Sequence, residues 1–392
     1  MNLFDIAIVG ASISGASLGA CLGMESVEVA LIEKDRFPRR KACGEGLSNI
    51  ALEAMNRMGL KTDRAIASGV PYFGYRVDLG NSSFPFANGG RRSLRGIGIE
   101  RYQLDTEIVE QACQSPSVTP YFEASINLLE RTAAGYRVGF SDGEALEARF
   151  LVLADGANSP CANRLGIPKV RKDPPLWGIS FILEGNYAEP LEEVVVLLKD
   201  GFEINCTPVS ASRLNVTFLT DRKNVKALQK EENRSHFLSE ACEKCGFHGS
   251  PLEAPLQVGP VSSTRRPYYR DSVMLLGDAA ETLDPVAGMG MTHGILMAEI
   301  ASKALVDTLI KGCDETVALQ RYAEHAEIMS RPFRGFTRLT ASLMRSPARR
   351  FLLPPLASSF LPGVIRSALD ELPDFPISSS SLPNRFLSQV GA

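Results

Sequence analysis

The stretch IAIVGASISGASLG at residues 6–19 constrains this chain most. An apolar run ends at Gly10, small residues follow, and a second apolar run from Val27 ends at Glu33, 23 positions after Gly10. This order is typical of a buried parallel strand, a tight turn, a closely packed helix and an acidic residue that binds a ribose hydroxyl. A helix N-terminus offers free N–H groups and positive potential, so the stretch predicts a cradle for a pyrophosphate. The alternative is a plain strand–helix–strand unit.

Ser12 departs from the G-x-G-x-x-G fingerprint, because it occupies the position of the middle glycine. That glycine lets the backbone approach the phosphates, whereas the first and third glycines, here Gly10 and Gly15, allow the tight turn and the close packing of helix on strand. A serine adds only a CH2OH group, which either turns away or donates a hydrogen bond to a phosphate oxygen. We therefore expect weaker cofactor binding than with glycine, not loss of binding.

A second segment, RFLVLADGANSPCANRLGIP at residues 149–168, contains another strand that ends in a turn. The predicted strand at 150–154 is closed by Asp155 and Gly156. Asp155 either anchors a turn that serves a ligand or only caps the turn.

A third segment, SVMLLGDAAETLDPVAGMGMTHGILMAEIA at residues 272–301, combines a strand end with a glycine-rich loop. The predicted strand at 273–276 is closed by a Gly-Asp pair at 277–278, and the loop at 284–291 leads into a helix from Thr292. A carboxylate at a strand end can accept a hydrogen bond from a sugar hydroxyl. A glycine-rich loop that enters a helix can point N–H groups at an electron-rich ring edge.

The three segments together resemble the FAD-binding fold of the glutathione-reductase type, in the version with a single dinucleotide domain. The chain is identified as a member of the superfamily of group A FAD-dependent monooxygenases and geranylgeranyl reductases, with the flavin-dependent halogenases as relatives. RFPRRKACGEGLS at 36–48 and RYQLD at 101–105 are similar to further segments of this superfamily. The resemblance covers residues 1–330 and implies an α/β fold. Its parts are a Rossmann-like FAD-binding domain, an antiparallel-sheet substrate domain interleaved with it, and a C-terminal helical tail.

The resemblance also implies roles for particular residues around FAD. The first turn would cradle the pyrophosphate, Glu33 would bind the adenosine ribose, and Asp278 would hold the ribityl chain. Arg101 would lie beside the phosphates and the ribityl chain, or else be a surface arginine that opens a helix. The N–H groups of the loop at 288–291 would face the N1 and O2 edge of the flavin. The predicted cofactor-binding set is Gly10, Ser12, Ile13, Ser14, Gly15, Glu33, Lys34, Lys41, Arg101, Asp155, Gly277, Asp278, Pro285, Gly288, Met289, Gly290 and Met291.

Residues 193–220 show a different pattern, in which Phe202, Ile204 and Cys206 alternate with polar residues. Alternation with a period of two predicts an antiparallel sheet with one buried face. We assign this sheet to a substrate domain that roofs the flavin. The predicted FAD-binding domain consists of residues 1–71, 96–170 and 264–335, the substrate domain of 72–95 and 171–263, and the helical or loose tail of 336–392.

The function that the resemblance implies is that of an FAD-dependent monooxygenase. NADH or NADPH would reduce FAD transiently, because no second glycine fingerprint appears, and a C4a-(hydro)peroxyflavin would transfer one oxygen atom of O2 to an aromatic or lipophilic small molecule. The first alternative is a geranylgeranyl-reductase-like enzyme that saturates isoprenoid double bonds, followed by a halogenase and an inactive flavin-binding homologue. No catalytic acid, base or nucleophile is evident from the sequence. His293 is expected to pack in its helix, and Cys43 lies either in the core or near the flavin.

Composition excludes other classes of protein. A net charge of −3 over 392 residues gives no general attraction to nucleic acid. No apolar run is long enough to span a membrane and the start lacks a basic n-region, so we expect a cytoplasmic protein with reduced cysteines. Cys242, Cys245 and His248 form only half of a zinc site, so no metal is expected.

The first twenty positions of the segment at 331–360 contain six arginines and no acidic residue. It either touches a membrane surface as an amphipathic segment or packs on the protein with its arginines outward. The sequence carries no signal for an oligomeric state.

Overall fold

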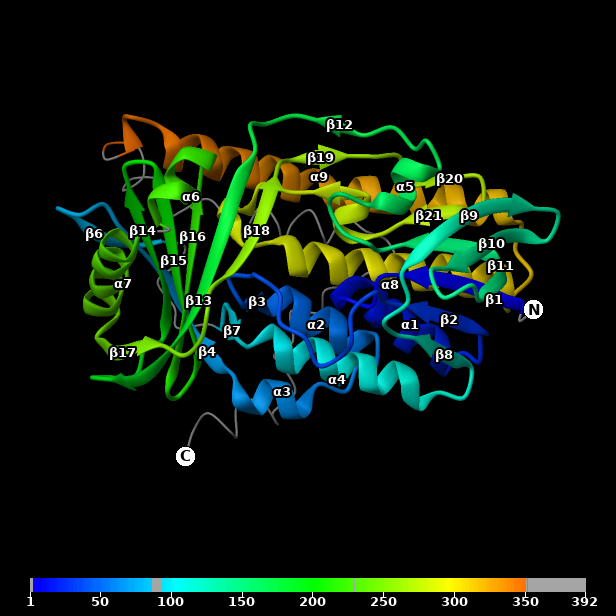
Figure 1. Ribbon diagram of the computed structural model, residues 1–392, viewed down its shortest axis with the longest axis horizontal. Coiled ribbons are helices and arrows are strands. Elements are labelled where there is room, and N and C mark those ends of the chain that lie inside the picture. The colour runs from blue at the N-terminus through cyan, green and yellow to red at the C-terminus, as the bar shows by residue number, and fades with distance from the viewer. Residues whose placement is uncertain (1–2, 87–93, 229, 350, 352–392) are drawn as a thin grey trace.

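The structure is a computed structural model and describes residues 3–86, 94–228, 230–349 and 351. Two eight-stranded sheets lie at opposite ends of the molecule, and helices fill the space between and around them (Figure 1). Segments that are far apart in the sequence alternate between the two sheets. This is the predicted α/β class, with a Rossmann-like sheet interleaved with a second sheet.

The first sheet has the strand order β20-β21-β11-β1-β2-β8, with β10 and β9 continuing from β11. Strand β1 pairs in parallel with β2 and β11, and β21 pairs in parallel with β11. The three predicted strand ends therefore meet at one edge, where open parallel sheets bind ligands. The bounds are β1 Leu3–Val9, β2 Val29–Ile32, β8 Val118–Tyr121, β9 Ile126–Thr132, β10 Gly135–Phe140, β11 Ala145–Leu153, β20 Tyr269–Arg270 and β21 Val273–Leu275.

Helices cover the first sheet closely because their packing faces are small or apolar. Helix α1 is almost wholly buried, and it contacts both α8 and α4. Strand β1 and α1 share one apolar core with α8. The helices around this sheet are α1 Ile13–Met24, α2 Asn49–Arg57, α3 Asp63–Ser68, α4 Arg101–Gln114, α5 Pro160–Arg164 and α8 Gly290–Leu309.

The second sheet has the order β17-β13-β16-β15-β14-β5-β6, with β18 also paired to β13. Its pairs are antiparallel except for β14 with β5, which run parallel. Two helices, α6 and α7, cover the face that holds Ile204 and Cys206. The bounds are β5 Gly74–Asp78, β6 Ser83–Phe86, β13 Leu176–Tyr187, β14 Glu193–Lys199, β15 Phe202–Ser210, β16 Arg213–Thr220, β17 Phe247–Pro251, β18 Leu256–Val261, α6 Arg222–Leu228 and α7 Glu231–Cys245.

The opposite face of the second sheet is polar, yet it is also covered. Glu203 and Thr207 on β15 and Asn215 on β16 are all buried. The alternation in the sequence therefore marks two covered faces, of which the apolar one packs on helices and the polar one turns toward the first sheet.

Two three-stranded sheets and two short 3₁₀ helices complete the space between the large sheets. Their bounds are β3 Gly46–Ser48, β4 Val70–Tyr72, β7 Gly96–Gly98, β12 Val170–Arg171, β19 Thr264–Arg265, β22 Glu281–Thr282, η1 Gly277–Ala279 and η2 Pro285–Ala287.

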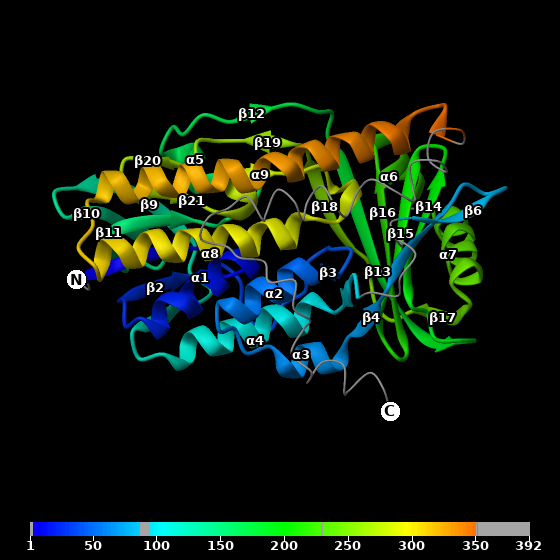
Figure 2. The same cartoon turned by 180° about the vertical axis from the view of Figure 1, so that it is seen from behind.

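Helix α9, Glu315–Arg345, runs along the molecule from the first sheet to the second (Figures 1 and 2). It passes without a break through position 336, where we placed the start of the tail. Phe333, Thr337 and Met344 are buried, so the basic segment packs on the protein as far as the structure describes it. The predicted loose stretch within 352–392 lies outside the described residues.

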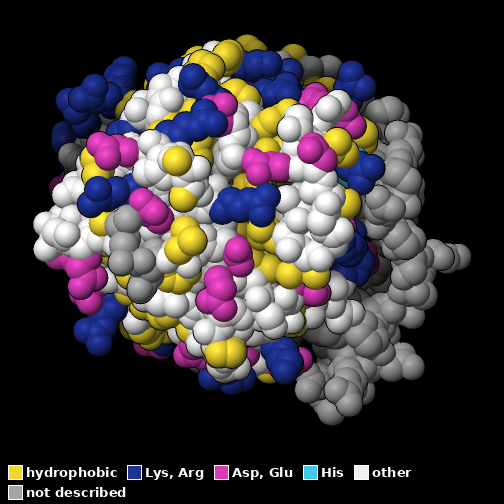
Figure 3. Space-filling model, turned by 90° about the vertical axis from the view of Figure 1, so that its right-hand side faces the viewer, with side chains coloured by type: hydrophobic (Ala, Val, Ile, Leu, Met, Phe, Trp, Pro, Cys, Tyr) yellow, Lys and Arg dark blue, Asp and Glu magenta, His cyan; other side chains and the backbone are white. Residues whose placement is uncertain are grey.

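The surface near the N-terminus carries interspersed basic and acidic side chains (Figure 3). No helix in the described part of the chain is long and apolar enough to cross a membrane. In the same residues no group of three or more His, Cys, Asp or Glu side chains is placed to hold a metal ion. Cys242 and Cys245 lie at the end of α7, and Cys245 is buried in the core of the second sheet.

Candidate cofactor and substrate cavity

A cavity of about 920 Å³ lies between the strand ends of the first sheet and the polar face of the second. Most of the predicted cofactor-binding residues line it. They are Ser12, Ile13, Ser14, Lys41, Arg101, Asp278, Pro285, Gly288, Met289, Gly290 and Met291. The others lie behind this lining or, in the case of the exposed Lys34, on the surface.

The first turn and the ends of β11 and β21 form the floor of the cavity. Glycines of the first and third motifs allow these parts to pack closely. A Cβ atom at Gly15 would lie 1.8 Å from the carbonyl oxygen of Gly10, and one at Gly10 would lie 2.4 Å from the carbonyl oxygen of Ala154. A Cβ atom at Gly277 would lie 2.6 Å from Ser14 Oγ. Gly10 and Gly277 also have positive φ angles, +101° and +57°. The close packing of the first turn on the two downstream motifs therefore requires glycine.

The N-terminus of α1 opens into the cavity with free hydrogen-bond donors. No described residue accepts a hydrogen bond from the backbone N–H of Ile13 or Ser14. Lys41 lies nearby, and its pKa is lowered by burial first and by the charge of Arg101 second, while Asp278 opposes the shift. An anion at this helix end would meet both the positive end of the helix dipole and these cations.

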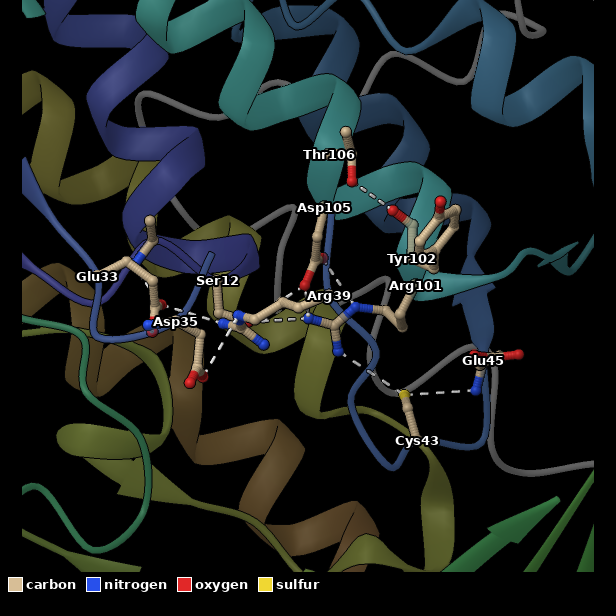
Figure 4. Close-up of polar contacts among 11 residues, drawn as sticks. Ser12, Glu33, Asp35, Arg39, Cys43, Glu45, Arg101, Tyr102, Asp105 and Thr106 are labelled. Carbon is tan, nitrogen blue, oxygen red and sulfur yellow. Dashed lines mark hydrogen bonds and ion pairs between the residues drawn. The ribbon is translucent and has the colours of Figure 1, made fainter. Parts of the chain in front are cut away.

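Ser12 contacts Arg101 and Asp105 (Figure 4). Its Oγ accepts a hydrogen bond of 3.0 Å from Arg101 Nη2, and Arg101 forms a two-pronged ion pair with Asp105 through bonds of 2.9 and 2.7 Å. Arg101 opens α4 but is only 4% exposed, so it is not a surface arginine. Asp105 was missed from the sequence, although its position four residues after Arg101 in RYQLD is the spacing of a helical ion pair.

Glu33 closes the first turn from behind. Its Oε2 accepts hydrogen bonds of 3.1 Å from the backbone N–H of Ala11 and of 3.1 Å from Arg39 Nη2. Its Oε1 accepts a third, of 3.3 Å, from the N–H of Asp35. The carboxylate therefore fixes the turn that precedes α1. No local pattern singles out Arg39, which reaches Glu33 through the fold of the loop at 33–39.

The two aspartates of the downstream motifs lie in different settings. Asp155 accepts hydrogen bonds from Ser159 Oγ, the N-cap residue of α5, and from the N–H of Cys161 in the first turn of that helix. Asp278 lines the cavity, and its pKa is raised by burial and lowered in part by Lys41 and Arg101. Of these two aspartates, only Asp278 lines the cavity.

Arg266 joins these two motifs, and sequence reasoning missed it. The guanidinium, only 2% exposed, donates to the carbonyl oxygens of Ala279 and Asn158 and to the side chain of Asn163. The turn after β11 and the turn after β21 are therefore held together by one buried cation. Its partners lie more than a hundred positions away or across a turn, so no local spacing signals it.

The loop at 284–291 forms one end of the cavity and is fixed by α9. Asp284 accepts a hydrogen bond of 3.1 Å from the N–H of Val286 and forms a two-pronged ion pair with Arg345 at 2.7 and 2.8 Å. Cβ atoms at Gly288 and Gly290 would meet nothing within 4 Å. The backbone of this loop is thus open to a ligand.

Cys43 lies at the junction of floor and roof. Its carbonyl oxygen accepts hydrogen bonds of 3.0–3.2 Å from Ser180 and Thr217 Oγ atoms and Asn215 Nδ2. Its Sγ is 3.8 Å from Arg101 Nη1. It lines the cavity, so of the two placements that the sequence left open it takes the one beside the predicted cofactor residues.

The far wall of the cavity is largely apolar. Strand β14 supplies Val194 and Val196, and Tyr72 precedes the second sheet. Phe336 and Met344 come from the last part of α9, beyond residue 335, which we had assigned to the tail. A ligand at this end would leave water for apolar side chains, as in most small-molecule sites.

His293 does not reach the cavity. It is 1% exposed, its Nε2 lies 2.8 Å from Ser330 Oγ, and its ring packs edge-on against Phe333. Burial lowers the pKa of this imidazole to about 3. The histidine therefore belongs to the packing between α8 and α9, as expected.

These residues fit a dinucleotide cofactor. The free N–H groups of Ile13 and Ser14 and the nearby cations suit a pyrophosphate, Asp278 suits a sugar hydroxyl, and the open backbone at 288–290 suits a ring edge. The apolar far wall suits an apolar molecule better than it suits a phosphate. The cavity thus combines a charged nucleotide end with an apolar end.

Comparison with known proteins gives a matching family and similar folds. The family model described as FAD binding domain matches residues 4–331. Menaquinone reductase of Mycobacterium tuberculosis is 23% identical over 77% of this chain and 76% of its own length. The crystal structure of p-nitrophenol 4-monooxygenase PnpA from Pseudomonas putida superposes with a TM-score of 0.74 at 18% identity, over 94% of this chain and 98% of that one. A geranylgeranyl bacteriochlorophyll reductase-like protein from Thermoplasma acidophilum superposes with a TM-score of 0.76 at 18% identity, over 95% and 96% of the two chains.

Proposed function

Since the chain belongs to the FAD binding domain family of oxidoreductases, we propose that it is an FAD-dependent monooxygenase acting on an aromatic or lipophilic small molecule. One observation carries this proposal. A single cavity has a nucleotide-binding floor at one end and an apolar wall at the other. Such a cavity brings a substrate against a flavin without a second nucleotide domain.

In this proposal the residues of the floor bind the cofactor. Ile13 and Ser14 donate N–H groups to the pyrophosphate, with Lys41 close by. Asp278 accepts a hydrogen bond from the ribityl chain, and the open backbone of 288–291 faces the flavin edge. When bound, FAD would supply the redox chemistry, in which two electrons from NADH or NADPH and one O2 would give one oxygen atom to the substrate and release the other as water.

Other predicted residues support the floor from behind. Glu33 fixes the first turn, and we propose that it also reaches the adenosine ribose. Arg101 holds Ser12 and neutralises Asp105, and Asp155 shapes the turn after β11. The predicted division into cofactor and substrate domains assigns the first sheet and α8 to FAD and the second sheet to the substrate.

Residues of the roof would orient the substrate. Asn205 and Thr207 on β15 and Thr217 on β16 line the cavity with hydrogen-bonding side chains, while Val194 and Val196 offer apolar surface. A substrate with an apolar body and one polar group satisfies both. Because the roof covers the floor, it would also exclude water from the reacting atoms.

A reductase is the second candidate, and one feature favours it. The thiol of Cys43 lies in the cavity beside the predicted flavin position, where a reductase that saturates an isoprenoid double bond needs a proton source. One solved structure of similar fold carries a geranylgeranyl-reductase-like name, and one sequence relative is named menaquinone reductase. A halogenase has no such local feature in its favour.

The two candidates differ in how the reduced enzyme reacts with oxygen. The holoprotein is reduced anaerobically and mixed with oxygenated buffer while absorbance spectra are recorded. A flavin–oxygen adduct that persists long enough to be resolved supports the monooxygenase. Direct return to oxidised flavin, with no such adduct resolved, favours the reductase.

A further inference from the structure

Glu45 occupies an unusual backbone position in the wall of the cavity. Its φ angle is +57°, in the left-handed region that favours glycine, and the residue is only 6% exposed. The peptide N–H donates to Cys43 Sγ at 3.4 Å, and the carbonyl oxygen accepts from the N–H of Ile99 at 2.9 Å (Figure 4). The fold therefore holds Glu45 in a backbone conformation that is unfavourable for any residue with a side chain.

One oxygen of the Glu45 carboxyl group has no partner. The backbone N–H of Arg101 hydrogen-bonds to the carboxyl group, yet Oε2 is buried and no described residue bonds to it. Buried polar atoms in proteins are nearly always hydrogen-bonded. Because Glu45 lines the cavity, the missing partner is expected among the cavity's ligands.

The neighbours of Glu45 place it beside the predicted cofactor. On one side it meets Arg101, next to the first turn and the predicted phosphates. On the other side β3 follows and ends at Ser48, whose Oγ lies 2.7 Å from Oγ1 of Thr292, just after the ring-facing loop. The segment 45–48 thus runs from the phosphate side toward the ring side of the cavity.

We propose that Glu45 contacts the cofactor directly and hydrogen-bonds bound FAD through its free carboxyl oxygen. The inference rests on the proposed use of the cavity for FAD. It adds a residue that neither the motifs nor the fold class assigns.

The charges around Glu45 decide whether it donates or accepts. Burial raises the pKa of its carboxyl group to about 8, with the neighbouring carboxylate of Glu100 as the second cause. Arg101 and Arg40 act in the opposite direction, and Glu100 is itself paired with Arg213 on β16 at 2.9 Å. At neutral pH the group is therefore mostly a neutral acid, which can donate its proton to a carbonyl oxygen or ring nitrogen of the flavin.

The test is a titration of the apoprotein with FAD, followed by flavin fluorescence from about pH 6 to about pH 9, on the wild type, Glu45→Gln and Glu45→Ala. The wild type should bind with constant affinity at the acidic end and lose about tenfold as the pH rises through the pKa of Glu45, since one neutral hydrogen bond accounts for about that factor. Glutamine keeps a donor that does not titrate, so Glu45→Gln should bind like the wild type at low pH and remain constant. Glu45→Ala should bind about tenfold more weakly than the wild type does at the acidic end, and its affinity should not change with pH.

A neighbouring variant sharpens the test. Glu100→Gln removes the like charge, so the pKa of Glu45 falls and the wild-type midpoint should shift to lower pH. Melting curves of the apo forms check that each variant is folded. The inference is overturned if Glu45→Gln keeps the pH dependence of the wild type, or if Glu45→Ala binds FAD as tightly as the wild type. A wild type that binds no FAD at any pH overturns the proposed function itself.

Discussion

The floor and the roof of the cavity are built by different means. In the floor the backbone sets the geometry. A Cβ atom at Gly15 would lie 1.8 Å from a carbonyl oxygen, and the N-terminus of α1 presents free N–H groups. In the roof side chains set the geometry, through the hydroxyl and amide groups of β15 and β16 and the apolar residues of β14. The floor therefore tolerates little change without losing its ligand. The roof can change its chemistry while the floor stays intact.

The largest expected effect comes from the buried ion pair of the floor. Arg101→Met leaves the carboxylate of Asp105, which is 1% exposed, without its cation. We expect a loss of about 3–5 kcal/mol in the free energy of unfolding, measured by urea titration. The double variant Arg101→Met, Asp105→Asn removes the stranded charge and should recover part of this loss. A single variant as stable as the wild type would show that the floor does not depend on this pair.

The second effect tests the backbone geometry of the same region. Gly15→Ala forces a Cβ atom against the carbonyl of Gly10, so we expect a loss of about 3 kcal/mol in stability and no measurable FAD binding. Gly19→Ala is the matched control on the same helix, since its Cβ atom would meet Leu31 and Ile8 at ordinary distances of 3.6–3.8 Å. This control should keep FAD and gain up to about 1 kcal/mol. Equal behaviour of the two variants would contradict the packing argument.

The third prediction concerns the contribution of a side chain of the floor to cofactor binding. Asp278→Ala removes the aspartate of the Gly-Asp pair, which lines the cavity, and FAD should bind about 10- to 100-fold more weakly, as expected for loss of a charged hydrogen bond. The purified variant should lose its yellow colour on dialysis. Asp271→Ala, just before β21 and half exposed, serves as control and should keep it. Full occupancy in Asp278→Ala would refute the assignment.

The smallest effect concerns α9, which joins roof and floor. Arg345→Ala breaks the ion pair with Asp284 that fixes the loop at 284–291, but Arg345 is 43% exposed, so the cost should be only about 1 kcal/mol. Arg349→Ala breaks a pair with the fully exposed Asp200 and should change nothing measurable. Thermal melts of both variants provide the measurement. A larger loss for the second variant would contradict the view that α9 acts through the loop.

The sequence predicted the floor better than the roof, for a physical reason. Three local motifs carry their own spacing, and parallel pairing of β1, β11 and β21 brings their ends together. The partners of these motifs were harder to find. Arg266 bonds to residues over a hundred positions away, so it has no local signature. The i,i+4 spacing of Asp105 was readable but was not used.

The roof depends on contacts that no local pattern encodes. Phe336 and Met344 reach the cavity because α9 crosses the molecule, whereas their sequence alone suggested a separate tail. The alternation of polar and apolar residues on β15 was visible in the sequence. Only the tertiary fold shows that the polar face of this strand is also buried. The placement of the Ser12 side chain also depends on the tertiary fold. Its hydroxyl accepts a hydrogen bond from Arg101, which the sequence could not pair with it.

One measurement tests the central claim that this cavity is an FAD site most directly. The apoprotein is titrated with FAD by isothermal calorimetry, beside the Gly15→Ala variant and its Gly19→Ala control. We predict one FAD bound per chain in the wild type and in Gly19→Ala, and no binding heat in Gly15→Ala. A wild-type chain that takes up no FAD, or a Gly15→Ala chain that binds it as tightly as the wild type, would contradict the account.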